Sequence, residues 1–146
     1  YNLMFSRLFQ TTYNKLSFED IQFAIIHSDQ FILINTLMTT DQSCLICGTV
    51  PYNKEEELIN KLISSGNNTA KKVIIYGKHG LDESTTTKYN QLQTLGFQSV
   101  YIYVGGLFEW LLLQDIYGKD EFPTTSPLLD ILKHKPPRTF GGNLLT

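Results

Sequence analysis

The feature that most constrains the fold is the alternation of short apolar runs with stretches of helical character. Three continuous apolar runs have the length of strands, at residues 31–34, 73–76 and 100–104. A run that is apolar at every position is typical of a strand that is covered on both faces. Parallel strands need crossover connections, which are usually helices. The sequence therefore predicts an α/β fold with a central, mostly parallel sheet of about four to five strands, flanked by helices on both faces.

Capping residues set the bounds of the helices between the runs. Ser17 is followed by acidic residues in the next turn, which predicts the start of a first helix. Asn53 predicts the start of a second helix over 54–65, and a third helix is predicted over 83–95. Serine followed by proline favours a helix start, so a last short helix is predicted over 126–132.

The composition excludes two classes of partner. The chain has 146 residues, 42% of them hydrophobic, which is enough for one domain with its own core. The formal net charge of −2 provides no broad basic field for nucleic acid. No apolar run approaches the roughly 20 residues that cross a membrane. We therefore expect neither nucleic acid nor a membrane as a partner.

The cysteine content and the first residues bear on the compartment. The two cysteines are too few for a disulfide framework, which favours a reducing, intracellular environment. Residues 1–15 are mildly basic and amphipathic and contain no acidic residue, as in a mitochondrial presequence. An N-terminal arm over 1–16 that packs its Phe and Leu side chains on the domain explains the same residues. Both a cytoplasmic and a mitochondrial location stay open.

A candidate site follows the second apolar run, where a strand, a loop and a helix start meet. Backbone N–H groups converge at such a junction, and α/β proteins often bind anions there. With a lysine and a histidine in the loop, a small-anion sensor is one interpretation. Asp82 and Ser84 are also typical helix-capping residues, which is the plainer interpretation. The loop consists of Gly77, Lys78, His79, Gly80, Leu81 and Asp82.

Several spaced motifs resemble the rhodanese-like domain over roughly residues 17–116. Residues 105–110 read Gly-Gly-Leu-Phe-Glu-Trp, similar to the Gly-Gly-x-x-x-Trp signature that follows the last core strand of that family. Residues 45–50 stand where the family has a His-Ile-Pro-Gly-Ala-like turn, and residues 32–35 stand where an apolar strand ends in Asp-Val-Arg. The strand, loop and helix from Val73 match the segment that carries the active-site loop. The resemblance implies a rhodanese-like domain over 17–116 and a C-terminal extension over 117–146.

The resemblance also implies that this loop has lost its nucleophile. In active members a cysteine that carries a persulfide follows the strand directly, and here that position is Gly77. Asp82 stands where an arginine is usual, and Glu83 adds a second negative charge that opposes an anionic substrate such as thiosulfate. The loop also lacks both residues that a phosphatase of the Cys-(x)5-Arg type needs, the cysteine and the arginine. We therefore expect no catalytic residue in the loop and a pseudoenzyme, with sulfur transfer through a displaced Cys44 or Cys47 as the alternative.

The pair Cys44 and Cys47 has the spacing of a redox motif or of half a zinc site. A redox pair normally lies at a helix N-terminus, whereas this pair lies in a loop. The three histidines, His27, His79 and His134, show no ligand spacing. The favoured interpretation is that both cysteines are small apolar residues beside the core, because free cysteine is often buried. We expect no metal site and no cofactor.

A candidate surface for a protein partner follows Trp110. The helix there is apolar most of the way round, because Trp110 shares a face with Leu113 while Leu111 and Leu112 point elsewhere. Together with Phe122 of the extension, Leu111 and Leu112 form the predicted partner surface, and burial under the extension is the alternative. The sequence thus predicts an inactive rhodanese-like domain that serves as a binding or structural module, for example as a subunit of a larger assembly.

Overall fold

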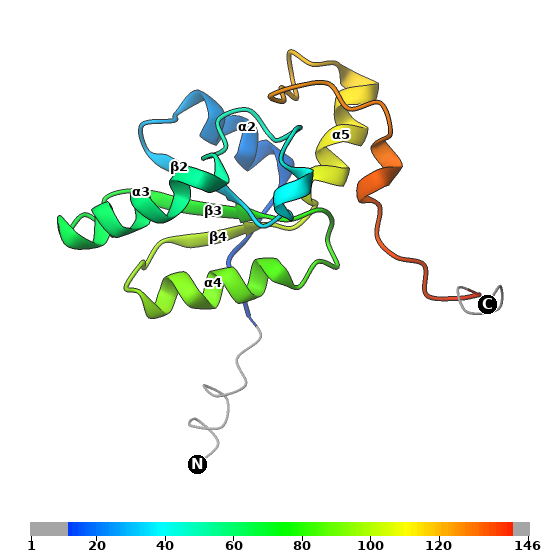
Figure 1. The fold of residues 1–146 in the computed structure, drawn as a ribbon. Coiled ribbons are helices and arrows are strands. Elements are labelled where there is room, and N and C mark those ends of the chain that lie inside the picture. Colours follow the sequence, from blue (N-terminus) through cyan, green and yellow to red (C-terminus); the bar gives the residue numbers. More distant parts are fainter. Residues whose placement is uncertain (1–11, 142–146) are drawn as a thin grey trace.

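A computed structural model describes residues 12–141 of the chain, and the predicted α/β class is confirmed. Strands and helices alternate along the chain, with two 3-10 helices, η1 and η2, among them (Figure 1). In chain order they are β1 Lys15–Leu16, α2 Phe18–Ile26, β2 Phe31–Asn35, η1 Thr39–Asp41, α3 Tyr52–Ser64, β3 Lys72–Tyr76, α4 Ser84–Thr94, β4 Val100–Tyr103, α5 Gly106–Tyr117 and η2 Ile131–His134.

The sheet has four strands in the order β1-β4-β3-β2, and all neighbours are parallel. The two central strands, β3 and β4, come from two of the apolar runs, and every residue of β3 after Lys72 is buried. Beyond β2 the ladder continues through one isolated parallel bridge, between Leu33 and Thr49. The prediction of a mostly parallel sheet of this size is therefore confirmed.

Each face of the sheet has its own core. On one face, α2 and α5 pack over side chains of alternate strand positions, together with residues that follow α5. On the other face, α3 and α4 cover the remaining strand positions. Figure 1 shows α2 and α5 above the sheet and α4 below it. The largest fully buried side chains are Trp110, Tyr76 and Tyr103.

Several helix bounds differ from the predicted ones by one or two residues. The second helix, α3, begins at Tyr52 after Pro51, so the predicted cap Asn53 lies inside the helix. Proline already has the backbone geometry of a helix start, and its carbonyl accepts a hydrogen bond from the N–H of Lys54 at 2.9 Å. Ser17 is confirmed as the N-cap of α2, and its N–H donates to the carboxylate of Asp20 at 2.9 Å.

The predicted helix over 126–132 is wrong, because the segment after α5 is irregular until η2. The Ser126 carbonyl accepts hydrogen bonds from Cys44 Sγ at 3.1 Å and from Thr124 Oγ1 at 2.9 Å. Its hydroxyl donates to the Ser43 carbonyl at 2.5 Å. These tertiary bonds hold Ser126 against the loop before α3, in place of an N-cap role.

Parts of the predicted arm and of the predicted extension belong to the packed domain. Lys15–Leu16 form β1 and pair with β4, so the last residues of the predicted arm belong to the sheet. Phe122 and His134, from the predicted extension, are buried. The amphipathic stretch read as a possible presequence lies mostly outside the described residues. Within those residues, no helix is both long and apolar enough to cross a membrane.

Candidate functional site

The predicted loop lies at the carboxyl end of β3, beside the ends of β2 and β4. Gly77 is buried, Lys78 and His79 are half-buried, and Gly80 and Leu81 are exposed. The structure therefore brings the six predicted loop residues together at one edge of the sheet, between the start of α4 and the start of α5 (Figure 1).

The carboxylate of Asp82 folds back over Gly77. A Cβ atom built on Gly77 would lie 2.5 Å from Asp82 Oδ2 and 3.0 Å from Thr85 Cγ2. Asp82 Oδ2 also accepts a hydrogen bond from the N–H of Lys78 at 3.1 Å. The space directly above the residue that follows β3 is thus filled by a negatively charged group of the chain itself.

The second oxygen of Asp82 binds the start of α4. Asp82 Oδ1 accepts hydrogen bonds from the N–H of Ser84 at 3.1 Å and from its hydroxyl at 2.6 Å. Burial alone would raise the pKa of Asp82, but the hydrogen bonds from Ser84 and Lys78 outweigh it and the pKa is lowered. Asp82 is therefore held in its charged form and binds the first N–H of α4 from the residue before the N-cap, Glu83. The predicted capping role of Ser84 is wrong, because Ser84 is the first residue of the helix and its hydroxyl is hydrogen-bonded to Asp82 and Thr36.

His79 accepts a hydrogen bond within the loop. Its Nδ1 atom accepts the N–H of Leu81, with 3.1 Å between the two nitrogen atoms. The ring therefore acts as part of the turn.

The loop also docks on the first turn of α5, a relationship that the sequence reasoning missed. The N–H groups of Leu107 and Phe108 donate to the carbonyls of Gly77 and Lys78 at 2.9 Å and 2.8 Å. Gly106 has φ +69, and a Cβ there would lie 2.8 Å from the Gly77 carbonyl oxygen. The Gly-Gly pair at the start of α5 was the available signal, because a close backbone approach needs a residue without a side chain.

Two clefts border the loop. One, of about 350 Å³, lies between the loop, the start of α4 and the edge of the sheet at β1, and Tyr13, Lys15, Asp82 and Thr86 are among its lining residues. The other, of about 510 Å³, lies over the start of α5 and is lined in part by Phe18, Phe108, Glu109 and Pro136. His79 and Gly80 line both clefts, so the loop separates two open hollows.

A buried hydroxyl ties the loop before α3 to the central strand β3, and no local sequence pattern indicates this contact. The Tyr76 hydroxyl accepts a hydrogen bond from the N–H of Ile46 at 3.1 Å and lies 2.8 Å from Thr49 Oγ1. Burial of the side chain raises the pKa of this phenol far above its usual range. Tyr76 thus stays protonated and serves the packing of the chain.

The two cysteines lie on the segment that Tyr76 holds. Cys44 is buried and donates to the Ser126 carbonyl at 3.1 Å, and Cys47 is half-buried. Burial raises the pKa of the Cys44 thiol, although hydrogen bonds with Thr124 and Ser126 lower it in part. No cluster of His, Cys, Asp or Glu that could hold a metal ion occurs within residues 12–141.

The predicted partner surface needs correction for two of its three residues. Leu111 is 1% exposed and Phe122 is 3% exposed, so both belong to the core. Leu111 lies on the inner side of α5, and Phe122 packs on the ring of Trp110, with ring centroids 4.9 Å apart. The alternative interpretation, in which this region is buried together with the extension, fits both residues. Leu112 is 38% exposed and remains on the surface.

Comparison with known proteins agrees with this architecture. Residues 45–113 match the family described as the rhodanese-like domain. No curated protein matches the sequence of the chain.

Solved structures provide a second comparison. The Alr3790 protein from Anabaena sp. is 22% identical, with a TM-score of 0.55 over 81% of this chain and 97% of its own. A yeast protein tyrosine phosphatase of the rhodanese family is 17% identical, with a TM-score of 0.58 over 84% of this chain and 99% of its own.

A single-domain sulfurtransferase from Saccharomyces cerevisiae is 15% identical, with a TM-score of 0.53 over 74% of this chain and 96% of its own. At these identities the likeness is one of fold. The chain therefore has the fold of rhodanese structures, and its residues 45–113 match the rhodanese-like domain.

Proposed function

We propose that this chain is a catalytically inactive rhodanese-like domain that acts as a binding or structural module. The observation that carries the proposal is the carboxylate of Asp82 above Gly77, where a Cβ would lie 2.5 Å from Asp82 Oδ2. Similar structures include a sulfurtransferase and a tyrosine phosphatase. Nucleophilic catalysis of either kind needs a side chain that attacks the substrate, and Gly77 offers none.

The geometry disfavours an anion sensor at the same loop. The Lys78 N–H and the Ser84 N–H, which a bound phosphate or sulfate would use, already donate to Asp82. The Asp82 carboxylate is held in its charged form and repels a second anion. An internal carboxylate thus takes the place of an external ligand.

A displaced cysteine is also disfavoured as a sulfur carrier. The thiolate is the reactive form of cysteine, and burial of Cys44 works against it by raising the pKa of the thiol. Cys47 is half-buried in a loop, beside a cleft that Leu33 and Leu58 line together with Ser28 and Lys71, and so it lacks the helix N-terminus at which reactive thiolates are usually stabilised.

The surface that supports a binding role is the outer side of α5. Leu112 and Ile116 lie four residues apart, which places them on one side of the helix, and they are 38% and 70% exposed. Tyr117 follows at 65% exposed. Neighbouring exposed apolar side chains of this kind favour a protein partner, whose identity the sequence leaves open.

The catalytic half of the proposal is tested by thiosulfate:cyanide sulfurtransferase assays on the pure protein. We expect the wild type and a Cys44→Ser/Cys47→Ser double variant to give the same background rate. Gly77→Cys alone should stay inactive, because its Cβ meets Asp82, whereas Gly77→Cys/Asp82→Ser frees both the space and the loop amides. Turnover in the wild type well above that of the double cysteine variant would overturn the proposal.

The binding half is tested by native mass spectrometry of the tagged protein purified from its own cells. We expect a complex that Leu112→Glu/Ile116→Glu dissolves. The matched control is Ile26→Glu, an equally apolar side chain that is 78% exposed on α2, and it should leave the complex intact. A protein that is recovered alone, or a complex that both variants retain, would contradict a role for this face of α5.

A further inference from the structure

The segment after α5 returns along that helix and ends beside the loop that follows β3. From Gly118 it runs past α5 to η2, and Pro136 lines the cleft over the first turn of α5 with Phe108 and His79. Figure 1 shows this segment, in orange to red, on the side of the sheet where the loop after β3 lies. Residues 131–136, here called the strap, therefore lie against the carboxyl end of the sheet.

One buried imidazole lies at the centre of the strap. His134 is 2% exposed, and its Nδ1 atom has no hydrogen-bond partner within the described residues. A neutral ring can be buried in this way at modest cost, whereas a charged ring without an acceptor is far more costly to bury. The closed position of the strap therefore suits a neutral His134.

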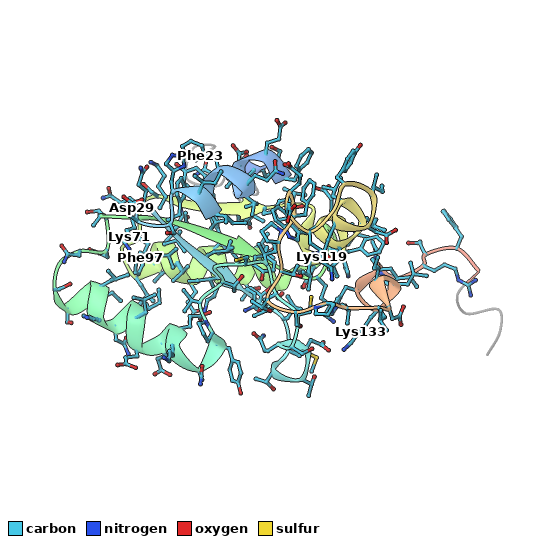
Figure 2. All side chains as sticks on the ribbon, turned by 90° about the horizontal axis from the view of Figure 1, so that it is seen from above. Phe23, Asp29, Lys71, Phe97, Lys119 and Lys133 are labelled. Carbon is cyan, nitrogen blue, oxygen red and sulfur yellow. The ribbon has the colours of Figure 1, made fainter. Side chains whose placement is uncertain are left out.

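Charged groups on three elements face this ring. From η1 comes Asp41, and from the loop after β3 comes Lys78. The strap and the residue before it add Lys133 and Asp130. Lys133 Nζ lies 3.1 Å from Asp41 Oδ1 and thereby ties the strap to η1. Figure 2 shows Lys133 on η2, on the side of the molecule away from Asp29 and Lys71.

Burial is the main influence on the ring and lowers the pKa of His134. The carboxylates of Asp41 and Asp130 act in the opposite direction, and the ammonium groups of Lys133 and Lys78 add to the lowering. Because the pKa is lowered in the folded chain, the strap is most stable above the ordinary value of 6.5. This stability is lost as the pH falls from there through the lowered value.

Apart from His134 and the ion pair between Lys133 and Asp41, the strap is held by Ile131, whose side chain is partly buried against the core. The strap contains one turn of 3-10 helix, and the side chains of Leu132 and Lys133 are 60% and 43% exposed. Leu129, just before it, is 99% exposed. Segments with so few buried contacts open locally at lower cost than the sheet unfolds.

We propose that the strap is a pH-sensitive cover, which lies closed over the loop after β3 while His134 is neutral and opens when His134 takes up a proton. Opening would uncover the half-buried Lys78 and widen the cleft beside Phe108. The device is built from the packing of residues 131–136 and does not depend on the catalytic state of the loop.

Hydrogen exchange measured by mass spectrometry between pH 7.5 and 5 tests the proposal, with each rate corrected for the intrinsic pH dependence of exchange. We expect protection of a peptide over 129–136 to fall with pH, by up to about tenfold per unit because one proton is taken up. Peptides over β3 should keep their protection. The His134→Phe variant, which cannot be protonated, should stay protected at both ends of the range.

A second variant keeps the proposal testable if His134→Phe does not fold. Lys78→Met removes a cation that lowers the pKa of His134 in the closed strap, so the closed strap should tolerate the proton better and lose less protection between pH 7.5 and 5 than the wild type does. Equal pH dependence in the wild type and in His134→Phe would overturn the proposal. The proposal would also fail if residues 129–136 of the wild type kept constant protection, or if β3 lost protection at the same pH. It would fail as well if Lys78→Met lost as much protection over 129–136 as the wild type.

Discussion

The indole N–H of Trp110 donates a hydrogen bond to the carbonyl of Pro123 at 3.1 Å. The same carbonyl accepts the N–H of Cys47 at 3.0 Å, so one backbone group joins α5 to the loop before α3. The Trp110 side chain is fully buried. The segment after α5 is thereby an integral part of the core and holds two distant parts of the chain together.

Phe122→Ala should show how much this segment contributes to stability. The ring is 3% exposed and packs on Trp110 and Phe18, with ring centroids 4.9 Å and 5.6 Å apart. We expect the free energy of unfolding to fall by about 3–5 kcal/mol, as for other buried phenylalanines. Urea denaturation measures it. Phe140→Ala is the matched control, because Phe140 is 88% exposed and should change little. A similar small loss in both variants would remove Phe122 from the core.

Gly106→Ala should separate close packing from backbone strain. Gly106 and Gly66 both have positive φ, +69 and +73, but a Cβ on Gly66, which follows the end of α3, meets nothing within 4 Å. Gly66→Ala should therefore cost only the left-handed conformation, about 1–2 kcal/mol. Gly106→Ala adds a clash with the Gly77 carbonyl, for which we expect a further loss of about 1–3 kcal/mol. Equal losses in thermal or urea unfolding would contradict the close approach of the loop and α5.

The parts of the fold that follow from local patterns were predictable. The apolar run that became β3 forms a strand because a continuous apolar run needs cover on both faces, and Gly96, with φ +98, ends the third helix as expected. The two-residue strand β1 was not predictable, because it exists only through its pairing with β4. The path of the segment after α5 was missed for the same reason: Ser126 reads as a helix cap but is held by Ser43 and Cys44.

At the candidate site, too, local features were predictable from the sequence and tertiary contacts were not. The loop over 77–82 and the capping role of Asp82 were visible as a strand, a loop and a helix start in the sequence. That Asp82 also covers Gly77 is a matter of side-chain direction, which spacing alone does not reveal. Leu111 and Phe122 were assigned to a surface because an apolar helix has no local sign of which side is covered. The burial of His134 likewise depends on contacts far apart in the sequence.

Tyr76→Phe tests the buried hydroxyl that joins the sheet to the loop before α3. The change leaves the N–H of Ile46 without its acceptor at 3.1 Å and removes the contact with Thr49 Oγ1. An unpaired buried donor costs about 1–3 kcal/mol, and we expect a loss of this size in urea denaturation. Tyr52→Phe is the matched control, because Tyr52 is 52% exposed and should be neutral. A neutral Tyr76→Phe would mean that water or another group replaces the hydroxyl.

Asp82→Asn tests whether the loop is held by a charged carboxylate. The pKa of Asp82 is lowered in the folded chain, because the hydrogen bonds from Ser84 and Lys78 outweigh the effect of burial. A carboxylate of this kind contributes stability above its unfolded pKa, near 3.8, and loses it as the pH falls through the lowered folded value. We therefore expect Asp82→Asn to be less stable than the wild type at pH 7, with a smaller difference at pH 3.

Urea denaturation at both pH values measures this difference. The matched control is Glu83→Gln, which removes the neighbouring carboxylate, on an exposed side chain. That variant should follow the wild type at both pH values, because surface charges of this kind contribute little. If Asp82→Asn and the wild type differ by the same amount at pH 7 and pH 3, the charge of Asp82 does not hold the loop. In that case the geometry above Gly77 depends on packing alone.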